Sequence, residues 1–253
     1  MCHMVSRVCR VRRVGMLKPD PAPAGRSVSM PSRIVTRVLD DLFAGKLKPG
    51  DFLGTEAQMV ETFQASRAPV REALGRLEAL GVVRVKTGVG GGASIAVGEP
   101  GRFATALAVQ FILLGVSAEE VFDARIAVEA RAAELAAMHA SPEDLMKLQG
   151  LLADIRASGE AGRNPIGLIL DYHMAIVEAS GARTLIALMQ AISHALLNLY
   201  RASSYPSGTA GADTGYQSLG EILKRIETRD APGAGRAMHE HLLRQRDAVT
   251  QNR

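Results

Sequence analysis

The sequence has very little cysteine, few aromatic residues and no tryptophan. Both cysteines, Cys2 and Cys9, lie in the first ten residues, which excludes a disulfide framework or a multi-cysteine metal site as the support of the fold. This usage fits a reducing compartment, and we expect a cytoplasmic protein. Aromatic residues make up 4% of the chain, while alanine, leucine and valine dominate, so the composition favours packed helices.

Long hydrophobic runs are missing as well. The stretch AVQFILLGV, from Ala108 to Val116, is much shorter than the roughly 20 apolar residues that cross a bilayer. We therefore expect a soluble protein. The chain of 253 residues is 47% hydrophobic, which suffices for one large or two modest domains.

Acidic residues are scarce at the N-terminal end. Residues 1–33 hold seven Lys or Arg and one acid, Asp20, whereas residues 34–98 hold eight against seven and the remainder fifteen against eighteen. This asymmetry permits contact with nucleic acid near the N-terminus. Residues 1–33 are rich in Arg, Pro and Gly without a sustained period, and we expect a disordered basic arm. Two interpretations stay open, an arm that touches phosphates or a true start at Met16 or Met30.

Residues 34–98 are predicted to form a small domain that begins with two short helices. Apolar residues at helical spacing indicate a first helix that starts at Ile34 and ends at Gly45. A turn follows. Thr55 then opens a second helix, because Thr55 and Gln58 have the spacing of a capping box.

A third helix is predicted from about Arg67 to Ala79. Ser66 is a natural N-cap, and Pro69 suits the first turn of a helix, where its missing N–H is not needed. Arg67 and Arg71 lie together beside the apolar face, near the start of this helix.

After the third helix the apolar period changes from helical to two. Val83 and Val85 alternate with charged residues, and a glycine-rich turn then leads into a second apolar strand, which predicts a β-hairpin. Lys86 and the side-chain-free Gly88 and Gly90 form a basic wing that can approach a minor groove closely. Three helices followed by a hairpin are the order of a winged helix-turn-helix.

Arg67 and Arg71 are candidates for direct contact with DNA. A helix in the major groove reads bases with its first two turns, and an arginine can bond O6 and N7 of guanine together. Ser66 and the first backbone amides can meet a phosphate. A solvated pair of Arg71 with Glu72 or Glu78 is the alternative, and the hairpin favours the DNA contact. A nucleotide-binding glycine loop is disfavoured, because no Lys-Ser/Thr follows the glycines and no helix begins there.

Beyond residue 98 almost the whole chain reads as helix, in about six to seven segments. Capping boxes at Ser117 and Ser141 open two of them, and Pro165 precedes a third. Residues 202–215 are predicted to be a loop. We expect an all-helical bundle over residues 99–253 and a protein that is mostly α.

The segment from Ile34 to Val97, which includes SRAPVREALGRL, closely resembles the DNA-binding domain of the GntR family of bacterial transcription regulators, whose signature runs S-R-x-P-V-R-E-A-L-x-x-L. The resemblance implies that Arg67 and Arg71 contact bases of a palindromic operator, with Ser66 and the wing glycines near the backbone. One departure is Ala57, where many members carry an arginine, and it puts one base or phosphate contact in doubt. The candidate DNA-binding residues are Thr55, Ser66, Arg67, Pro69, Arg71, Lys86, Gly88 and Gly90.

The helical remainder, from about Arg102 to Asp247, resembles the FCD effector domain of the FadR-type subfamily. The resemblance implies a dimer that senses a small carboxylic metabolite or an acyl derivative, often beside a divalent metal held by one Asp and three His. His173 and His241 match two of those positions, whereas Ile169 and Leu219 replace the other two. Two imidazoles without a carboxylate make a weak site for Zn, Mn or Ni, so we expect a pocket without metal.

Three polar residues of this domain are candidates for effector binding. Arg125 can hold a carboxylate through both of its terminal amino groups, but an intrahelical pair with Glu129 is as well supported. For His173 and His241, a buried and hydrogen-bonded core position and a contact with the effector stay equally open. His194 and His239 are expected on helix surfaces.

The function that these observations favour is a ligand-responsive regulator, a repressor or an activator, that binds operator DNA as a homodimer. A metal-dependent sensor of the same family is the first alternative, with Asp171 or another carboxylate as the missing ligand. A metal-dependent helical enzyme that uses His173, His241 and Asp171 is the second. We expect no enzyme, because no nucleophile stands in a recognised motif and the metal set is incomplete.

Overall fold

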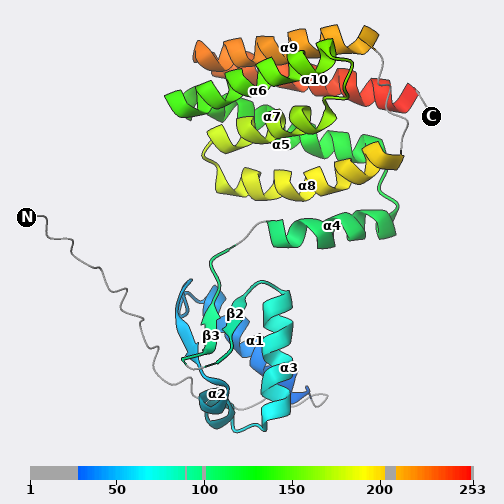
Figure 1. Cartoon of the computed structure of the whole chain (residues 1–253). Helices are drawn as coiled ribbons and strands as arrows, with labels where there is room; N and C mark the ends of the chain where they lie inside the picture. Colours follow the sequence, from blue (N-terminus) through cyan, green and yellow to red (C-terminus); the bar gives the residue numbers. More distant parts are fainter. Residues whose placement is uncertain (1–27, 89, 99–100, 203–208, 252–253) are drawn as a thin grey trace, which may run out of the picture. The chain divides into compact units, whose positions relative to one another are not determined.

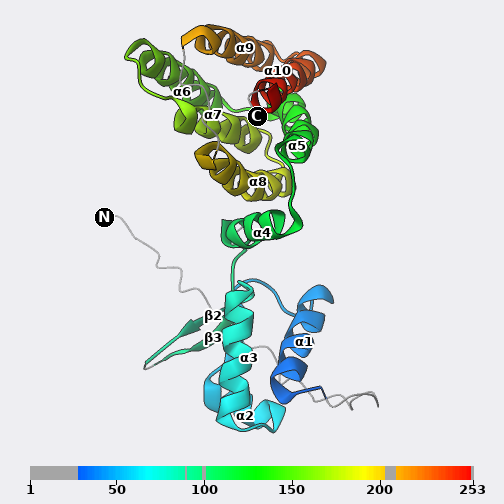
Figure 2. The same cartoon turned by 90° about the vertical axis from the view of Figure 1, so that its right-hand side faces the viewer.

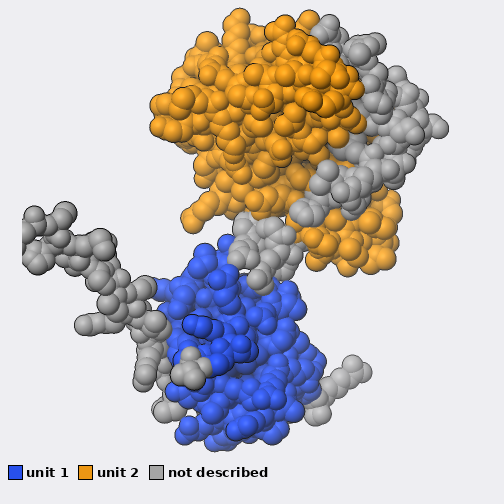
Figure 3. Space-filling view, viewed as in Figure 1, with its two compact units in different colours: residues 1–99 blue, residues 100–253 orange. Residues whose placement is uncertain are grey.

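The chain is described by a computed structural model that covers residues 28–88, 90–98, 101–202 and 209–251. The basic arm predicted for residues 1–33 lies outside this range except for its last six residues. The chain divides into two compact units, residues 1–99 and 100–253 (Figure 3). The described residues form ten helices and one small sheet (Figure 1), which confirms the prediction of a mostly α protein. None of the described helices is long and apolar enough to cross a membrane.

The N-terminal unit contains three helices and a three-stranded antiparallel sheet (Figure 2). The strands lie in the order β1-β3-β2, so β3 is the central strand. This is the winged arrangement expected from the sequence, with one additional strand. The elements are α1 (Met30–Phe43), β1 (Phe52–Gly54), α2 (Glu56–Phe63), α3 (Arg67–Ala79), β2 (Val83–Lys86) and β3 (Gly92–Ile95).

One apolar core connects these elements. Ile34 and Val38 of α1 are fully buried, as are Val70 and Leu77 of α3. Val83 of β2 joins the same cluster. Since the buried residues of α3 fall on one side, the opposite side of the helix stays in contact with solvent.

Two boundaries of this unit differ from the prediction. The first helix begins at Met30 and not at Ile34, because Pro31 occupies its first turn, where proline is well tolerated. The segment from Phe52 to Gly54, which follows the predicted turn, forms the short strand β1 and pairs with β3. Three residues are too few for alternating hydrophobicity to mark a strand.

The C-terminal unit consists of seven helices in its described part, the upper end of the predicted number. Ser117 and Ser141 cap their helices through reciprocal hydrogen bonds with Glu120 and Asp144, as their spacing predicted. The helices are α4 (Gly101–Leu114), α5 (Ala118–His139), α6 (Pro142–Glu160), α7 (Ile166–Ala179), α8 (Arg183–Ala202), α9 (Thr209–Glu227) and α10 (Ala231–Gln251).

The prediction of a loop over residues 202–215 was wrong from Thr209 onward, where α9 already runs. Residues 203–208 lie outside the described residues. The first turns of α9 are rich in glycine, alanine and threonine, and glycine and threonine have low helix propensity. The helix is anchored further along by Leu219, Ile222 and Ile226, which are buried in the bundle, so tertiary packing overrides local propensity.

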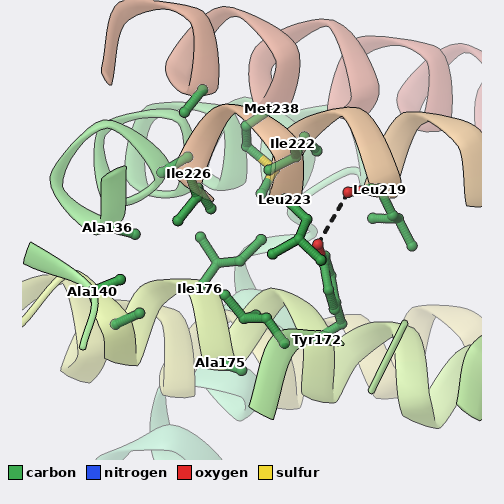
Figure 4. Packing of buried hydrophobic residues seen from close by; sticks show 14 of the residues in the cluster. Ala136, Ala140, Tyr172, Ala175, Ile176, Leu219, Ile222, Leu223, Ile226 and Met238 are labelled. Atoms are coloured by element: carbon green, nitrogen blue, oxygen red, sulfur yellow. Dashed lines mark hydrogen bonds between the residues drawn. The ribbon is translucent and has the colours of Figure 1, made fainter. Parts of the chain in front are cut away.

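The main core of this unit is formed by α5, α6, α7, α9 and α10 (Figure 4). Alanines of α5 such as Ala136 have no exposed surface, which lets the neighbouring helices approach closely. Ile176 of α7 lies against Ile222 and Ile226 of α9 (Figure 4). Tyr172 is the one large polar side chain in this picture, and its hydroxyl donates to the backbone oxygen of Leu219 at 3.0 Å.

Replacement of Tyr172 by phenylalanine should lower the free energy of unfolding by about 1 kcal/mol, because one buried hydrogen bond is lost while the ring is kept. Urea unfolding of both proteins, with the slope compared as well as the midpoint, measures this difference. A variant as stable as the parent protein would contradict a contribution of the Tyr172 hydrogen bond to the packing of α7 against α9.

Candidate functional site

The start of α3 carries a side-chain hydroxyl that does not cap the helix. Ser66 occupies the N-cap position as predicted, but its side chain makes no capping hydrogen bond. An N-cap side chain normally accepts from the amide of the second or third helical residue. The third residue here is Pro69, which has no N–H, and the amide of the second residue, Ala68, does not bond to Ser66 either. The Ser66 hydroxyl is exposed and forms no bond among the described residues, so it remains available to an incoming acceptor or donor.

Two exposed arginines follow Ser66 on the same helix end. Arg67, the first residue of α3, forms no ion pair with any described residue. Arg71, one turn later, donates from Nε to Oε2 of Glu56, at the start of α2, at 2.7 Å. The alternative partners expected from the sequence, Glu72 and Glu78, are engaged elsewhere in the unit.

The hairpin of β2 and β3 extends away from α3 as a wing (Figure 2). Its base is fixed to α3, because the Glu78 carboxylate accepts from the Val85 amide at 3.1 Å. Lys86 is exposed at the end of β2. Gly88 and Gly90 in the tip have φ angles of +90° and +74°, a conformation that favours glycine. The wing therefore carries a positive charge where β2 ends, and its tip has no side chains at Gly88 and Gly90.

A groove of about 390 Å³ lies between the wing and α2. Thr55 and Glu56 line one side of it, and Lys86 lines the other together with the wing glycines. Thr55 uses its hydroxyl to accept from the Gln58 amide at 3.2 Å, the predicted capping box. Ala57 is exposed beside it and contributes no charge. The predicted DNA-binding residues thus come from α2, α3 and the wing, around one end of the unit.

A second group of polar side chains is buried inside the C-terminal unit. Arg125 and Glu129 on α5 have no exposed surface, His173 on α7 has none either, and His241 on α10 is 2% exposed. Arg125 donates from Nε to Glu129 at 2.7 Å, which is the intrahelical pair left open by the sequence. His173 donates from Nδ1 to the other oxygen of Glu129 at 2.5 Å. We call these four residues, with Gln245, the buried polar cluster.

The side-chain amide of Gln245 fixes the protonation of His241. Its oxygen accepts from Nη1 of Arg125 at 3.3 Å, so its nitrogen faces Nε2 of His241 at 3.0 Å. Because an amide nitrogen can only donate, Nε2 of His241 accepts. The proton therefore lies on Nδ1, which donates to Oγ of Ser218 at 2.6 Å. His241 is held as the neutral imidazole.

The electrostatics of the cluster agree with this arrangement. Burial, with smaller contributions from His173 and Arg125, holds the pKa of His241 well below 6.5. Burial alone would raise the pKa of Glu129, but Arg125 and His173 outweigh it and lower the pKa to about 2. Glu129 is therefore an ionised carboxylate inside the bundle.

The cluster does not fit a divalent metal. A metal needs lone pairs, and Nε2 of His241 is occupied by Gln245, while both oxygens of Glu129 are occupied by Arg125 and His173. Nε2 of His173 is buried without a hydrogen-bond partner and is the one ring nitrogen of the two histidines left for a ligand. In the described part of the chain, no group of three His, Cys, Asp or Glu is placed to hold a metal.

The remaining residues of the predicted metal set do not complete a site. Ile169 and Leu219 pack in the apolar core, and Leu219 is 1% exposed. Asp171 is exposed, because two residues along a helix turn its side chain away from His173. His239 is exposed as predicted, two residues before the buried His241.

Sequence reasoning missed Glu56, Ser218 and Gln245 as members of these sites. Gln245 lies one helical turn after His241, and this spacing alone could have suggested a contact. Glu56 and Ser218 are far in sequence from the residues that they contact, so no local pattern indicated them.

Both halves of the chain match known protein families. Residues 31–91 match the family described as "Bacterial regulatory proteins, gntR family", and residues 120–244 match the "FCD domain". The HTH-type transcriptional regulator LutR of Bacillus subtilis is 31% identical over 213 residues, which cover 81% of this chain and 94% of that protein. The Uxu operon transcriptional regulator of Escherichia coli is 29% identical over 214 residues, 77% of this chain and 76% of that protein.

A solved structure supports the fold. The Streptococcus agalactiae GntR structure superposes with a TM-score of 0.59 and covers 86% of this chain and 99% of that one, at 23% identity. The two chains therefore share a fold.

The depressed pKa of His241 predicts a loss of stability on acidification. A base whose folded pKa is below its unfolded value stabilises the fold fully above the unfolded pKa, about 6.5, and this contribution falls as the pH drops below it. The loss is at most about 1.4 kcal/mol per pH unit for one group. Glu129 adds its own loss only below its unfolded pKa of 4.5, so His241 dominates at milder pH.

Urea unfolding at about pH 7.5 and about pH 5.5 tests this, with the slope against pH read as the proton difference between states. His241→Gln should lose less stability between the two pH values than the parent protein, whatever its absolute stability. His239→Gln removes an exposed histidine from the same helix and should keep the parental slope. Equal slopes for all three proteins would show that His241 titrates alike in the folded and unfolded states.

Proposed function

The chain belongs to the gntR family of bacterial regulatory proteins and carries an FCD domain, and on this premise we propose that it is an effector-responsive regulator that reads operator DNA through Arg67 and Arg71. The family and the names of the relatives identify a transcription regulator and not an enzyme. The alternative of an enzyme built on His173, His241 and Asp171 therefore falls away.

One observation carries the assignment of the reading helix. α3 begins with an exposed hydroxyl and two exposed arginines, while its apolar side is buried against the rest of the unit. The Ser66 hydroxyl makes no capping hydrogen bond, and Pro69 has no amide to offer it. An unused hydroxyl and the positive end of the helix dipole suit a phosphate, and the arginines beside them suit guanine edges.

The wing provides the second contact. Lys86 carries a charge toward the backbone of the DNA, and Gly88 and Gly90 let the tip approach without a steric barrier. Lys86 contacts phosphate and not a base, so its loss should weaken binding to all sequences alike. Thr55, at the head of α2, lies across the groove and adds a further backbone contact.

The operator is proposed to be a palindrome read by a homodimer in the cytoplasm. Each copy presents one α3, and a two-fold axis between copies places two such helices on two half-sites about one helical turn of DNA, or a multiple of it, apart. The effector acts by binding two arrangements of the dimer unequally.

The effector is proposed to be a small carboxylic acid bound at the buried polar cluster without metal. Arg125 is a fully buried guanidinium in a bundle of apolar helices, and its partner there is itself a carboxylate, Glu129. His173 offers a buried Nε2 without a protein partner beside it. A carboxylate from outside meets the same chemistry that already accommodates Glu129. Since the cluster is closed to solvent, entry requires local opening of the bundle.

The DNA contact is tested by Arg67→Ala combined with Arg71→Ala. Each arginine contributes roughly 1 to 3 kcal/mol of discrimination between bases, so the double variant should lose specific binding to the promoter of its own gene. Fluorescence anisotropy with this duplex and with a scrambled duplex of equal length measures the specificity ratio.

Two variants serve as controls in the same assay. Arg76→Ala removes an equal charge from the far end of α3, where the side chain pairs with Glu72, and should keep the specificity ratio. Lys86→Ala should weaken binding to both duplexes, and the salt dependence of the binding constant should fall by about the amount of one phosphate contact. Specific binding retained by the double variant would remove Arg67 and Arg71 from base recognition.

The effector is tested by a thermal-shift screen of small organic acids. An acid at about one hundred times its dissociation constant stabilises the folded protein by roughly 2.7 kcal/mol. His173→Gln should abolish the rise in melting temperature that an active acid gives with the parent protein. Zn, Mn and Ni salts should give no comparable shift. A stoichiometric metal in the purified protein, or stabilisation by one of these metals, would favour the metal-dependent sensor.

A further inference from the structure

Arg71, which we propose to read a base, is paired with a residue of another helix. Its Nε donates to Oε2 of Glu56 at 2.7 Å across fifteen residues of sequence. This is its one hydrogen bond within the described part of the chain. The side chain of Arg71 is 67% exposed and that of Glu56 is 31% exposed, so the pair lies at the surface where α2 and α3 both face solvent.

The backbone of Glu56 is fixed by its place at the start of α2. It is the first residue of α2, directly after the capping box in which the Thr55 amide donates to the Gln58 side chain at 2.8 Å. A carboxylate in the first turn of a helix is also favoured by the helix dipole. Long side chains on a helix point back toward its N-terminus, which brings the Arg71 guanidinium toward α2. The ion pair therefore fixes a flexible side chain against a rigid backbone.

The geometry of the pair leaves the reading edge of Arg71 open. Glu56 uses Nε, and no hydrogen bond of the two terminal amino groups is found among the described residues. Those two groups form the fork that bonds O6 and N7 of guanine. We propose that Glu56 is a positioning residue that orients Arg71 end-on toward a guanine, and this inference rests on the proposed function.

The charge of Glu56 has a second consequence. A carboxylate close to the DNA surface repels phosphates and partly neutralises Arg71, so it weakens binding to every sequence. Orientation strengthens binding only where a guanine meets the fork. Specificity is the difference between these two affinities. Glu56 therefore raises the specificity ratio by weakening the non-specific complex more than the specific one.

The experiment is a base-preference profile. The full-length parent protein first selects its preferred duplex from a pool of random sequences. Each position of that duplex is then changed in turn, and binding of every changed duplex is measured for five proteins: the parent, Arg71→Ala, Glu56→Ala, Glu56→Gln and Glu61→Ala. The Arg71 variant identifies the position that Arg71 reads. Glu61→Ala removes an exposed acid from the same helix without touching Arg71 and controls for charge alone. Circular dichroism and thermal unfolding verify the fold of each protein.

We expect Glu56→Ala to reduce the preference at the Arg71 position by about threefold to tenfold, the range of one side chain that must be ordered on binding, with preferences elsewhere kept. Its affinity for a scrambled duplex should rise more than that of Glu61→Ala. Glu56→Gln, which keeps an acceptor for Nε, should restore part of the preference. In the free protein, the Arg71 Nε–H signal in NMR should exchange faster with water in Glu56→Ala.

Three results would overturn the inference. An unchanged profile in Glu56→Ala shows that Arg71 orients itself, and a loss at another position shows that Glu56 contacts a base directly. A profile altered equally by Glu61→Ala assigns the effect to charge alone. If the parent protein selects no sequence at all, the proposed function fails, and the positioning of Arg71 has no role to play in recognition. A parent that selects DNA with an unchanged Glu56 profile leaves the proposed function intact.

Discussion

A guanidinium without contact to water has to be neutralised inside the protein, and this constraint governs the centre of the C-terminal unit. Arg125 is fully buried, and Glu129 one turn along α5 supplies the opposite charge. The ionised carboxylate then needs a second donor, which His173 of α7 provides. The remaining guanidinium edge orients Gln245 of α10, which in turn fixes His241. Removal of one partner would leave a buried charge uncompensated, at a cost of roughly 3 to 5 kcal/mol, so α5, α7 and α10 are tied to one register.

In the N-terminal unit, by contrast, the two arginines at the start of α3 need no neutralising partner inside the protein. Arg67 and Arg71 are exposed to water, and the start of α3 leaves hydrogen-bonding groups unused. Ser66 makes no capping hydrogen bond, and Arg67 makes no ion pair with the described residues. A stable isolated fold would gain from a cap worth about 1 kcal/mol. Polar groups without hydrogen-bond partners are expected at functional sites, where a bound partner supplies the missing hydrogen bonds.

Local patterns foretold most of the fold, and distant contacts account for what they missed. The capping boxes at Thr55, Ser117 and Ser141 are local, and each formed as predicted. Strand β1 exists only because β3 pairs with it, so three residues on their own gave no signal. The start of α9 was predicted to be a loop from its glycines, although burial further along extends the helix. Among the polar residues, the Arg125–Glu129 pair was visible from its spacing, whereas the contact of Glu56 with Arg71 depends on how α2 packs against α3.

The closed cluster also constrains how an effector could act. A ligand changes an equilibrium only by its unequal affinity for two states, and in the closed state Glu129 already occupies the guanidinium that an external carboxylate would seek. An acid that binds Arg125 must therefore displace Glu129 or share the arginine with it, and either event disturbs α5. Helix α5 packs against α8, and α8 packs against α4, the helix that continues the chain from the N-terminal unit. Because a packed core has discrete arrangements and deforms little between them, an acid that competes for this arginine would, on our proposal, act through that series of helices.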